Sequence, residues 1–163
     1  MYLLRFDGGC RGNPGHGSSA AVLYKDFEKI DYSYTCLPGK VTNNESEYMG
    51  LILGARMAIH HGVQQLSIEG DSQLIIEHLF GTWECKHPRM KKYYQEAKRL
   101  FQQFHFIHGR WIPREKNKEA DGYCNLALDT RSSHGNTEWF QMPKFEPKKN
   151  DLRNFFTVTP VDT

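Results

Sequence analysis

The sequence predicts an α/β domain in which a mixed five-stranded sheet is flanked by helices. Before residue 40, apolar runs alternate with Gly, Pro, Asn and Asp. From Asn44 onward, apolar residues recur at helical spacing, and after Gly62 short strand-like and helix-like segments alternate. Hairpin strands followed by alternating helices and strands are typical of a mixed sheet covered by helices.

The first three strands are expected at residues 2–7, 18–25 and 30–37, where they would form an antiparallel meander. The first apolar run closes with Asp7, which opens the glycine-rich stretch FDGGCRGNPG. Aspartate is depleted in strands, so an acid that ends an apolar strand needs a purpose.

A long amphipathic helix is predicted from Asn44 to the C-terminal stop at Gly62. The remaining elements follow in alternation, and Pro88 and Gly81 supply helix boundary signals. They are a buried strand at 66–70, helices at 72–80 and 89–104, a strand at 105–112 and a last helix at 117–128.

The chain has 163 residues, which is enough for one domain, expected at 1–129, and a tail at 130–163. A net charge of +2 does not separate an enzyme from an interaction module. No apolar run is long enough to cross a membrane. Scattered cysteines without a signal segment predict reduced thiols in an intracellular protein, cytoplasmic or, in a eukaryote, nuclear. The spacing of Cys85, His87 and Cys124 fits no structural zinc motif.

Four acids occupy comparable positions at the ends of predicted elements. Asp7 and Asp71 each follow an apolar strand, and Glu47 and Asp121 each lie near the start of a helix. If the two strands are neighbours, both aspartates lie where open α/β sheets place ligands.

Four carboxylates in one place would repel one another by several kcal/mol unless protons or cations neutralise them. An all-oxygen cluster suits hard divalent cations such as Mg²⁺ or Mn²⁺. Two such ions can activate a water and stabilise the leaving oxygen in phosphodiester cleavage. The four acids therefore predict a metal-dependent hydrolase.

Each acid also has a purely structural interpretation. Glu47 fits a capping box with Asn44, Asp71 fits a cap for the helix after it, and Asp121 fits a helix-dipole partner. The set of four carries more weight than any one of them.

Four segments resemble type-1 ribonuclease H: FDGGCRGNPG, TNNESEYMGLILGARMA, IEGDSQLIIEHLFGTW and PREKNKEADGYCNLALD. The resemblance spans residues 3–129 and implies a ribonuclease H-like fold. It also implies an endonuclease that cuts the RNA strand of RNA/DNA hybrids with two Mg²⁺ ions, leaves 5′-phosphates, and removes primers or stray hybrids. Mn²⁺ is an alternative ion. The competing interpretation is a weakly catalytic binding module for hybrids or double-stranded RNA.

By this resemblance, Asp7 bridges both metals, Asp121 shares the metal that holds the attacking water, and Glu47 and Asp71 hold the other. The resemblance also implies three groups of nucleic-acid contacts, and close approach of the RNA strand would explain the glycines. They are Gly8, Gly9 and Cys10 to the RNA strand, Asn13, Asn43 and Gln73 in the minor groove, and Thr42, Asn44 and Trp83 to the DNA strand. Asn44 has a second candidate role as helix cap, and Trp83 has one in packing.

The chain departs from the family in two places. Many relatives carry a loop histidine ten residues ahead of the fourth acid, where this chain has Trp111. Arg114 or Glu115 in that loop would assist product release, or else form only a charged turn. A Lys- and Arg-rich protrusion is missing, so we expect modest, salt-sensitive affinity.

The tail carries Leu152, Phe155 and Phe156 on one side of a helical turn. This spacing resembles the peptide that docks repair enzymes on a sliding clamp, although Lys149 replaces the usual glutamine. Packing on the enzyme's own surface is the alternative. Nothing suggests a second subunit, so a monomer is expected.

Overall fold

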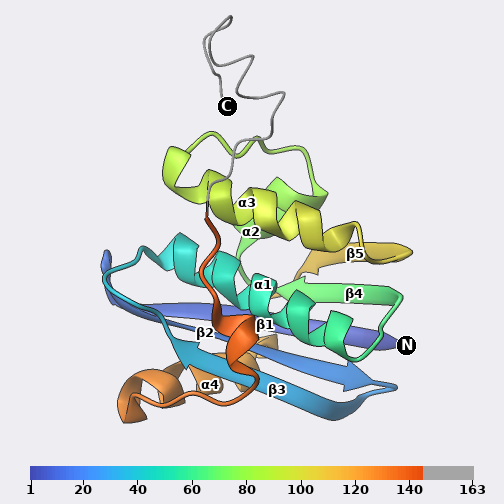
Figure 1. The fold of residues 1–163 in the computed structure, drawn as a ribbon, viewed down its shortest axis with the longest axis horizontal. Helices are drawn as coiled ribbons and strands as arrows, with labels where there is room; N and C mark the ends of the chain where they lie inside the picture. The colour runs from blue at the N-terminus through green and yellow to red at the C-terminus, as the bar shows by residue number, and fades with distance from the viewer. Residues whose placement is uncertain (145–163) are drawn as a thin grey trace, which may run out of the picture.

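The computed structural model describes residues 1–144. Its sheet has five strands in the order β3-β2-β1-β4-β5 (Figure 1). The first three pair antiparallel, and β4 runs parallel to both β1 and β5. The predicted mixed five-stranded sheet is confirmed. The strands are β1 (Tyr2–Gly12), β2 (Gly15–Lys25), β3 (Glu28–Cys36), β4 (Gln65–Gly70) and β5 (Phe106–Trp111).

Helices cover both faces of the sheet. Figure 1 shows α1, α2 and α3 on one side and α4 on the other. None of the helices within residues 1–144 is long and apolar enough to cross a membrane. The helices are α1 (Asn43–His60), α2 (Gln73–Phe80), α3 (Pro88–Phe101) and α4 (Lys118–Thr130), with 3-10 turns η1 (Arg114–Lys116) and η2 (Thr137–Phe140).

β1 is longer than the sequence suggested. Asp7 pairs with Ala20, and the ladder to β2 continues to the pair Gly12–Gly15. The prediction that the strand ends at Asp7 was wrong, because backbone pairing with β2 holds glycines that have low strand propensity on their own. Asp7 is therefore fixed within a strand.

The helix α1 presses directly on the backbone of β1. A Cβ added to Gly8 would lie 2.2 Å from the carbonyl carbon of Ser46, and one added to Gly50 would lie 2.3 Å from the carbonyl oxygen of Asp7. Gly8 is thus required by packing inside the protein. Its contact with the RNA strand stays a prediction, because Gly8 also lines the pocket described below.

The N-cap of α1 lies two residues earlier than predicted. Thr42 is the N-cap: its hydroxyl accepts from Glu45 N at 3.2 Å, and Glu45 Oε1 accepts from Thr42 N at 2.9 Å. The residues from 42 and from 44 both fit the capping-box signature, and the structure uses the first. Asn44 is therefore not the cap, and the Glu47 carboxylate is free of this role.

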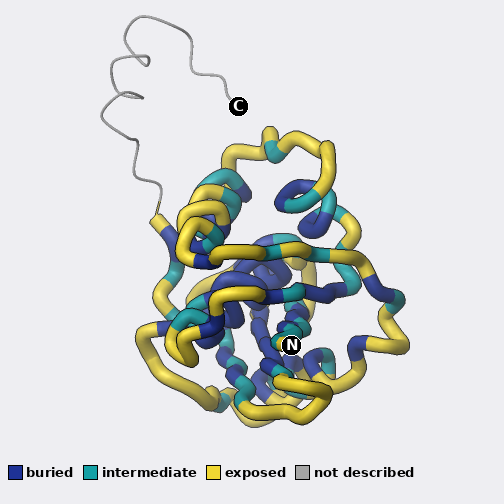
Figure 2. Tube along the Cα trace, turned by 90° about the vertical axis from the view of Figure 1, so that its right-hand side faces the viewer, coloured by how far each residue is buried: buried dark blue, intermediate teal, exposed yellow. Residues whose placement is uncertain are grey.

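The core lies between α1 and the central strands, and Figure 2 shows buried chain through the middle of the molecule. Leu4 and Phe6 of β1 and Leu51 and Ile52 of α1 are fully buried. Charge pairing supports the register across β1, β4 and β5: Arg5 Nε lies 3.0 Å and Arg110 Nε 2.7 Å from the Glu69 carboxylate.

The described start of the predicted tail packs on the domain. His134 pairs with Tyr34 of β3, and Trp139 of η2 is buried. The Arg56 guanidinium of α1 donates to the carbonyl oxygens of Trp139 at 2.9 Å and Gln141 at 2.7 Å. Leu152, Phe155 and Phe156 lie outside the described residues.

Candidate active site

The parallel register of β1 and β4 places two aspartates together. Phe6 pairs with Gly70, so the next residues, Asp7 and Asp71, stand side by side at the same end of the sheet. Asp71 does not cap α2, because Ser72 is the N-cap and its hydroxyl accepts from Ile75 N. The structural interpretation of Asp71 as a cap was wrong.

Two helices bring the other acids to this end of the sheet. Close contact between α1 and β1 carries Glu47 over Asp7. On the opposite face, Ser18 Oγ donates to Cys124 O at 2.8 Å and fixes α4 on β2. This contact positions Asp121, which lies in the first turn of α4 as predicted.

Asp7, Glu47 and Asp71 each offer a carboxylate oxygen within 4.8 Å of the others. Glu47 Oε1 is buried and has no hydrogen-bond partner among the described residues. A buried charged oxygen without a partner is costly. The donor set is entirely oxygen, which is the set that hard divalent cations prefer. The three residues therefore fit a Mg²⁺ or Mn²⁺ ion.

Asp121 shares a pocket of about 390 Å³ with these three acids. It does not belong to the compact group of three, and Arg114 Nη2 lies 3.8 Å from its Oδ1. The structure thus brings all four predicted acids to one pocket, and three of them have carboxylate oxygens within 4.8 Å of one another. Arg114 stands at the rim, next to the fourth.

The acids raise one another's proton affinity. Burial, and then the negative charge of Asp71, raise the pKa of Asp7 to about 7. Burial and the charge of Asp7 hold the pKa of Glu47 well above its ordinary value. Burial also raises the pKa of Asp71, although a hydrogen bond from Asn117 and the charge of Arg114 oppose the rise. A cation that displaces these protons would relieve the repulsion.

Asn117 is a site residue that the sequence analysis missed. Its buried Nδ2 donates to Phe6 O at 2.9 Å and to Asp71 Oδ2 at 3.3 Å, so it ties the loop before α4 to both strands. Its helix-start position predicted only a boundary, because the two contacts span more than forty residues of sequence.

The predicted nucleic-acid contacts surround the pocket. Gly8, Gly9, Cys10 and Asn43 line it. Asn13 Oδ1 accepts from Asn43 N at 3.0 Å, which joins the β1–β2 turn to the start of α1. A Cβ on Gly9 would meet only ordinary contacts at 3.7 Å or more, so this position, unlike Gly8, has room.

Three further residues were predicted to contact nucleic acid: Gln73, Trp83 and Asn44. Gln73 is the exposed first residue of α2, and Trp83 is half-exposed in the segment between α2 and α3. Asn44 lies in the first turn of α1. The structure shows where these side chains lie, and their contacts with nucleic acid stay predictions.

Trp111 does not occupy the loop. It is the last residue of β5, and its Nε1 donates to Asp71 O at 3.2 Å. The position ten residues before Asp121 therefore lies on a strand, within the predicted strand 105–112, and the segment between β5 and α4 is short. Arg114 and Glu115 lie in the 3-10 turn η1 in this segment.

The pocket and topology agree with comparisons to known proteins. A family model described as reverse transcriptase-like matches residues 5–127. "Ribonuclease HI" of Halobacterium salinarum is 34% identical over 124 residues, which cover 76% of this chain and 62% of that protein. The chain belongs to the type-1 ribonuclease H family.

Other members of this ribonuclease H family are also similar. The "Bifunctional protein Rv2228c" of Mycobacterium tuberculosis is 38% identical over 128 residues, 78% of this chain. The chain spans only 35% of that protein's length. A crystal structure of LC11-RNase H1 in complex with RNA/DNA hybrid superimposes with a TM-score of 0.76 at 27% identity, covering 80% of this chain and 99% of that one.

Proposed function

We propose that this chain is an endonuclease that hydrolyses the RNA strand of RNA/DNA hybrids with two divalent cations, Mg²⁺ or Mn²⁺. The observation that carries the proposal is the group formed by Asp7, Glu47 and Asp71, whose oxygens lie within 4.8 Å of one another. The buried, unpartnered Glu47 Oε1 supports a cation there. The hybrid bound to LC11-RNase H1 supports the substrate class.

The proposal gives each acid a role. As the family resemblance implies, Asp7 would hold both ions, Glu47 and Asp71 would hold one of them, and Asp121 would hold the other. When bound, the cations supply Lewis acidity and lower the pKa of the attacking water. Asn117 holds the Asp71 carboxylate in place through its 3.3 Å hydrogen bond. Arg114, beside Asp121, is the candidate for assisting product release.

Cleavage of a labelled hybrid tests the proposal. The purified chain is incubated with RNA/DNA hybrid, double-stranded RNA or double-stranded DNA, each with Mg²⁺, Mn²⁺ or EDTA. We expect cleavage of the RNA strand of the hybrid, 5′-phosphate products and no activity in EDTA. Binding of hybrid without metal-dependent cutting would favour the competing interpretation of a binding module. The double-stranded RNA arm decides whether that substrate is accepted.

A sliding clamp remains a proposed partner through Leu152, Phe155 and Phe156. A clamp would concentrate the nuclease at DNA by tethering. Calorimetry with a peptide of residues 147–163 and the organism's clamp tests it. Absence of heat at high micromolar concentration would remove the idea. The monomer and intracellular location are likewise proposals, which sedimentation and cell imaging would check.

A further inference from the structure

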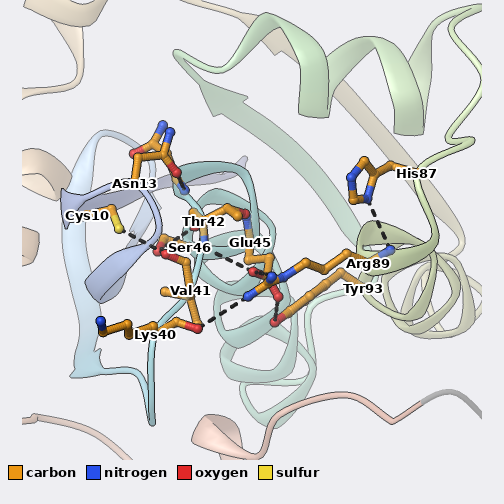
Figure 3. Close-up of polar contacts among 11 residues, drawn as sticks. Cys10, Asn13, Lys40, Val41, Thr42, Glu45, Ser46, His87, Arg89 and Tyr93 are labelled. Carbon is orange, nitrogen blue, oxygen red and sulfur yellow. Dashed lines mark hydrogen bonds and ion pairs between the residues drawn. The ribbon is translucent and has the colours of Figure 1, made fainter.

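A polar network joins the first two turns of α3 to the start of α1. Figure 3 shows Arg89 and Tyr93 of α3 reaching Glu45 of α1. Arg89 Nε donates to Glu45 Oε1 at 2.7 Å, and Tyr93 OH donates to Glu45 Oε2 at 2.9 Å. Glu45 is only 3% exposed. Its two oxygens are thus both engaged with α3, while Oε1 also accepts from the backbone of Thr42.

Arg89 holds the chain on both sides of Thr42. Its Nε binds Glu45, three residues after Thr42, and its Nη2 donates to the carbonyl oxygen of Lys40, two residues before it, at 3.3 Å. One planar guanidinium therefore fixes the segment 40–45, a task that the single ammonium of lysine does not reproduce. Figure 3 shows Lys40, Thr42 and Glu45 arranged around this group.

The same turn of α3 follows the segment that carries Trp83. His87 is the N-cap of α3, and its Nδ1 accepts from Arg89 N at 3.1 Å. The path from Trp83 to the N-cap is four residues long. The network therefore ties the Thr42 segment to the start of α3, four residues after Trp83. The family resemblance assigns both Thr42 and Trp83 to the DNA strand.

A gain in folding stability does not by itself explain the ion pair between Arg89 and Glu45. A buried carboxylate loses its hydration, and its partner seldom repays the loss in full. The Arg89 side chain is 46% exposed, so its own charge stays largely solvated and screened. Buried ionic groups are instead useful for fixing one arrangement among several. Here the arrangement that is fixed is the position of Thr42 relative to α3.

We propose that Glu45, Arg89 and Tyr93 are positioning residues that set the distance between the Thr42 segment and the Trp83 segment, so that both contact the DNA strand of a bound hybrid. The inference rests on the proposed function, because it assumes a hybrid substrate. The three residues act through Thr42 and Trp83 and do not touch the reacting atoms. Their loss therefore weakens hybrid binding and leaves the chemical step intact.

Steady-state cleavage of a labelled hybrid with four single variants and one double variant tests this role. Glu45→Gln keeps an acceptor for Thr42 N but removes the charge, Arg89→Met removes the guanidinium, and Tyr93→Phe removes one hydroxyl. Arg99→Met is the matched control, since Arg99 lies in the same helix, is 61% exposed and pairs with Glu96. Thermal melts confirm that each variant is folded, and Tyr93→Phe, the mildest change, keeps the test available if another variant unfolds.

We expect Glu45→Gln and Arg89→Met each to raise KM about fivefold or more, the size of one or two lost hydrogen bonds, with kcat within about twofold of wild type. Tyr93→Phe raises KM about twofold to fivefold, and Arg99→Met changes it by less than about twofold. The KM of the double variant Glu45→Gln/Arg89→Met is only slightly higher than that of either single variant, because both residues act through one network.

Glu45→Gln separates positioning from simple charge attraction. Removing a negative charge near a polyanion tightens binding if only electrostatics acts, whereas loss of positioning weakens it. A folded Glu45→Gln variant with an unchanged or lower KM overturns the proposal. Fluorescence anisotropy of hybrid binding in EDTA runs in parallel. If the wild-type protein binds hybrid but does not cut it, only the proposed activity is contradicted, and the anisotropy series still tests positioning. If the wild-type protein binds no hybrid, both the proposed activity and the positioning role are overturned.

Discussion

Asp7 and Asp71 stand side by side because the residues before them, Phe6 and Gly70, form a parallel register pair between β1 and β4. The ladder between β1 and β2 holds Asp7, and Asn117 holds Asp71. The acids are thus assembled by the fold before any cation arrives, which is how a rigid metal site keeps its geometry.

Replacing one acid tests the need for this assembly. Asp71→Asn keeps the size of the side chain and removes its charge, so we expect cleavage of hybrid to fall by about 100-fold or more. The exposed Glu28→Gln in β3 is the control, and it retains full activity. A fully active Asp71→Asn enzyme would contradict the proposed mechanism.

The stability of the metal-free protein should fall as pH rises from about 4 to about 7. The pKa of Asp7 is raised from 3.8 to about 7 in the folded state, so the unfolded chain releases this proton first as pH rises. Asp7 contributes roughly 4 kcal/mol to this loss. The raised pKa values of Glu47 and Asp71 add to it in the same direction. Melting temperatures in EDTA across this range measure it.

Asp7→Asn is the matched variant for the pH series. It removes the titrating group, so its melting temperature in EDTA falls less with pH and exceeds that of wild type at pH 8. Added Mg²⁺ stabilises wild type at pH 8 but has little effect on Asp7→Asn. If the melting temperatures of the two proteins fell equally with pH, Asp7 would be ruled out as the source of the pH dependence.

Two neighbouring glycines are expected to respond oppositely to alanine. A Cβ on Gly8 meets the Ser46 carbonyl carbon at 2.2 Å, whereas a Cβ on Gly9 meets its nearest atom at 3.7 Å. Gly8→Ala therefore destabilises the fold by about 3 kcal/mol or more. Gly9→Ala stays within about 1 kcal/mol of wild type. Urea denaturation measures both.

Gly9→Ala also tests the approach of the RNA strand. If the strand runs against the backbone at this position, the added methyl raises KM in a folded protein. Equal KM values for wild type and Gly9→Ala would mean that the RNA strand does not contact the backbone at Gly9.

Asn117→Ala removes two buried hydrogen bonds, to Phe6 O and to Asp71 Oδ2. We expect a loss of about 1–3 kcal/mol in the free energy of unfolding, together with a lower kcat, because Asp71 loses its support. Urea denaturation and hybrid cleavage measure the two effects. Wild-type kcat in the folded variant would show that Asp71 needs no such support.

Helices and strands that depend on local periodicity were predicted well. Features that depend on contacts with distant residues were predicted poorly. The helical spacing after Asn44 and the apolar run 66–70 correctly predicted α1 and β4, because each depends on its own residues. The end of β1 was misplaced, since its glycines are held by pairing with β2. The cap of α1 was misplaced because two capping signatures overlap and only packing selects one.

The four acids of the candidate site were named from their positions at element ends, and the fold brings them to one pocket. The residues that support them were not found. Asn117 and Arg89 act across more than forty residues, and neither carries a local signal beyond a helix start. Such partners become visible only when the strands and helices are placed in space.

Anomalous diffraction from a crystal soaked in Mn²⁺ tests the central claim most directly. We expect ion peaks bonded to Asp7, Glu47 and Asp71, with a second ion reaching Asp121. A fully soaked crystal with no ion among these carboxylates, or with Glu47 turned away from Asp7, would contradict it.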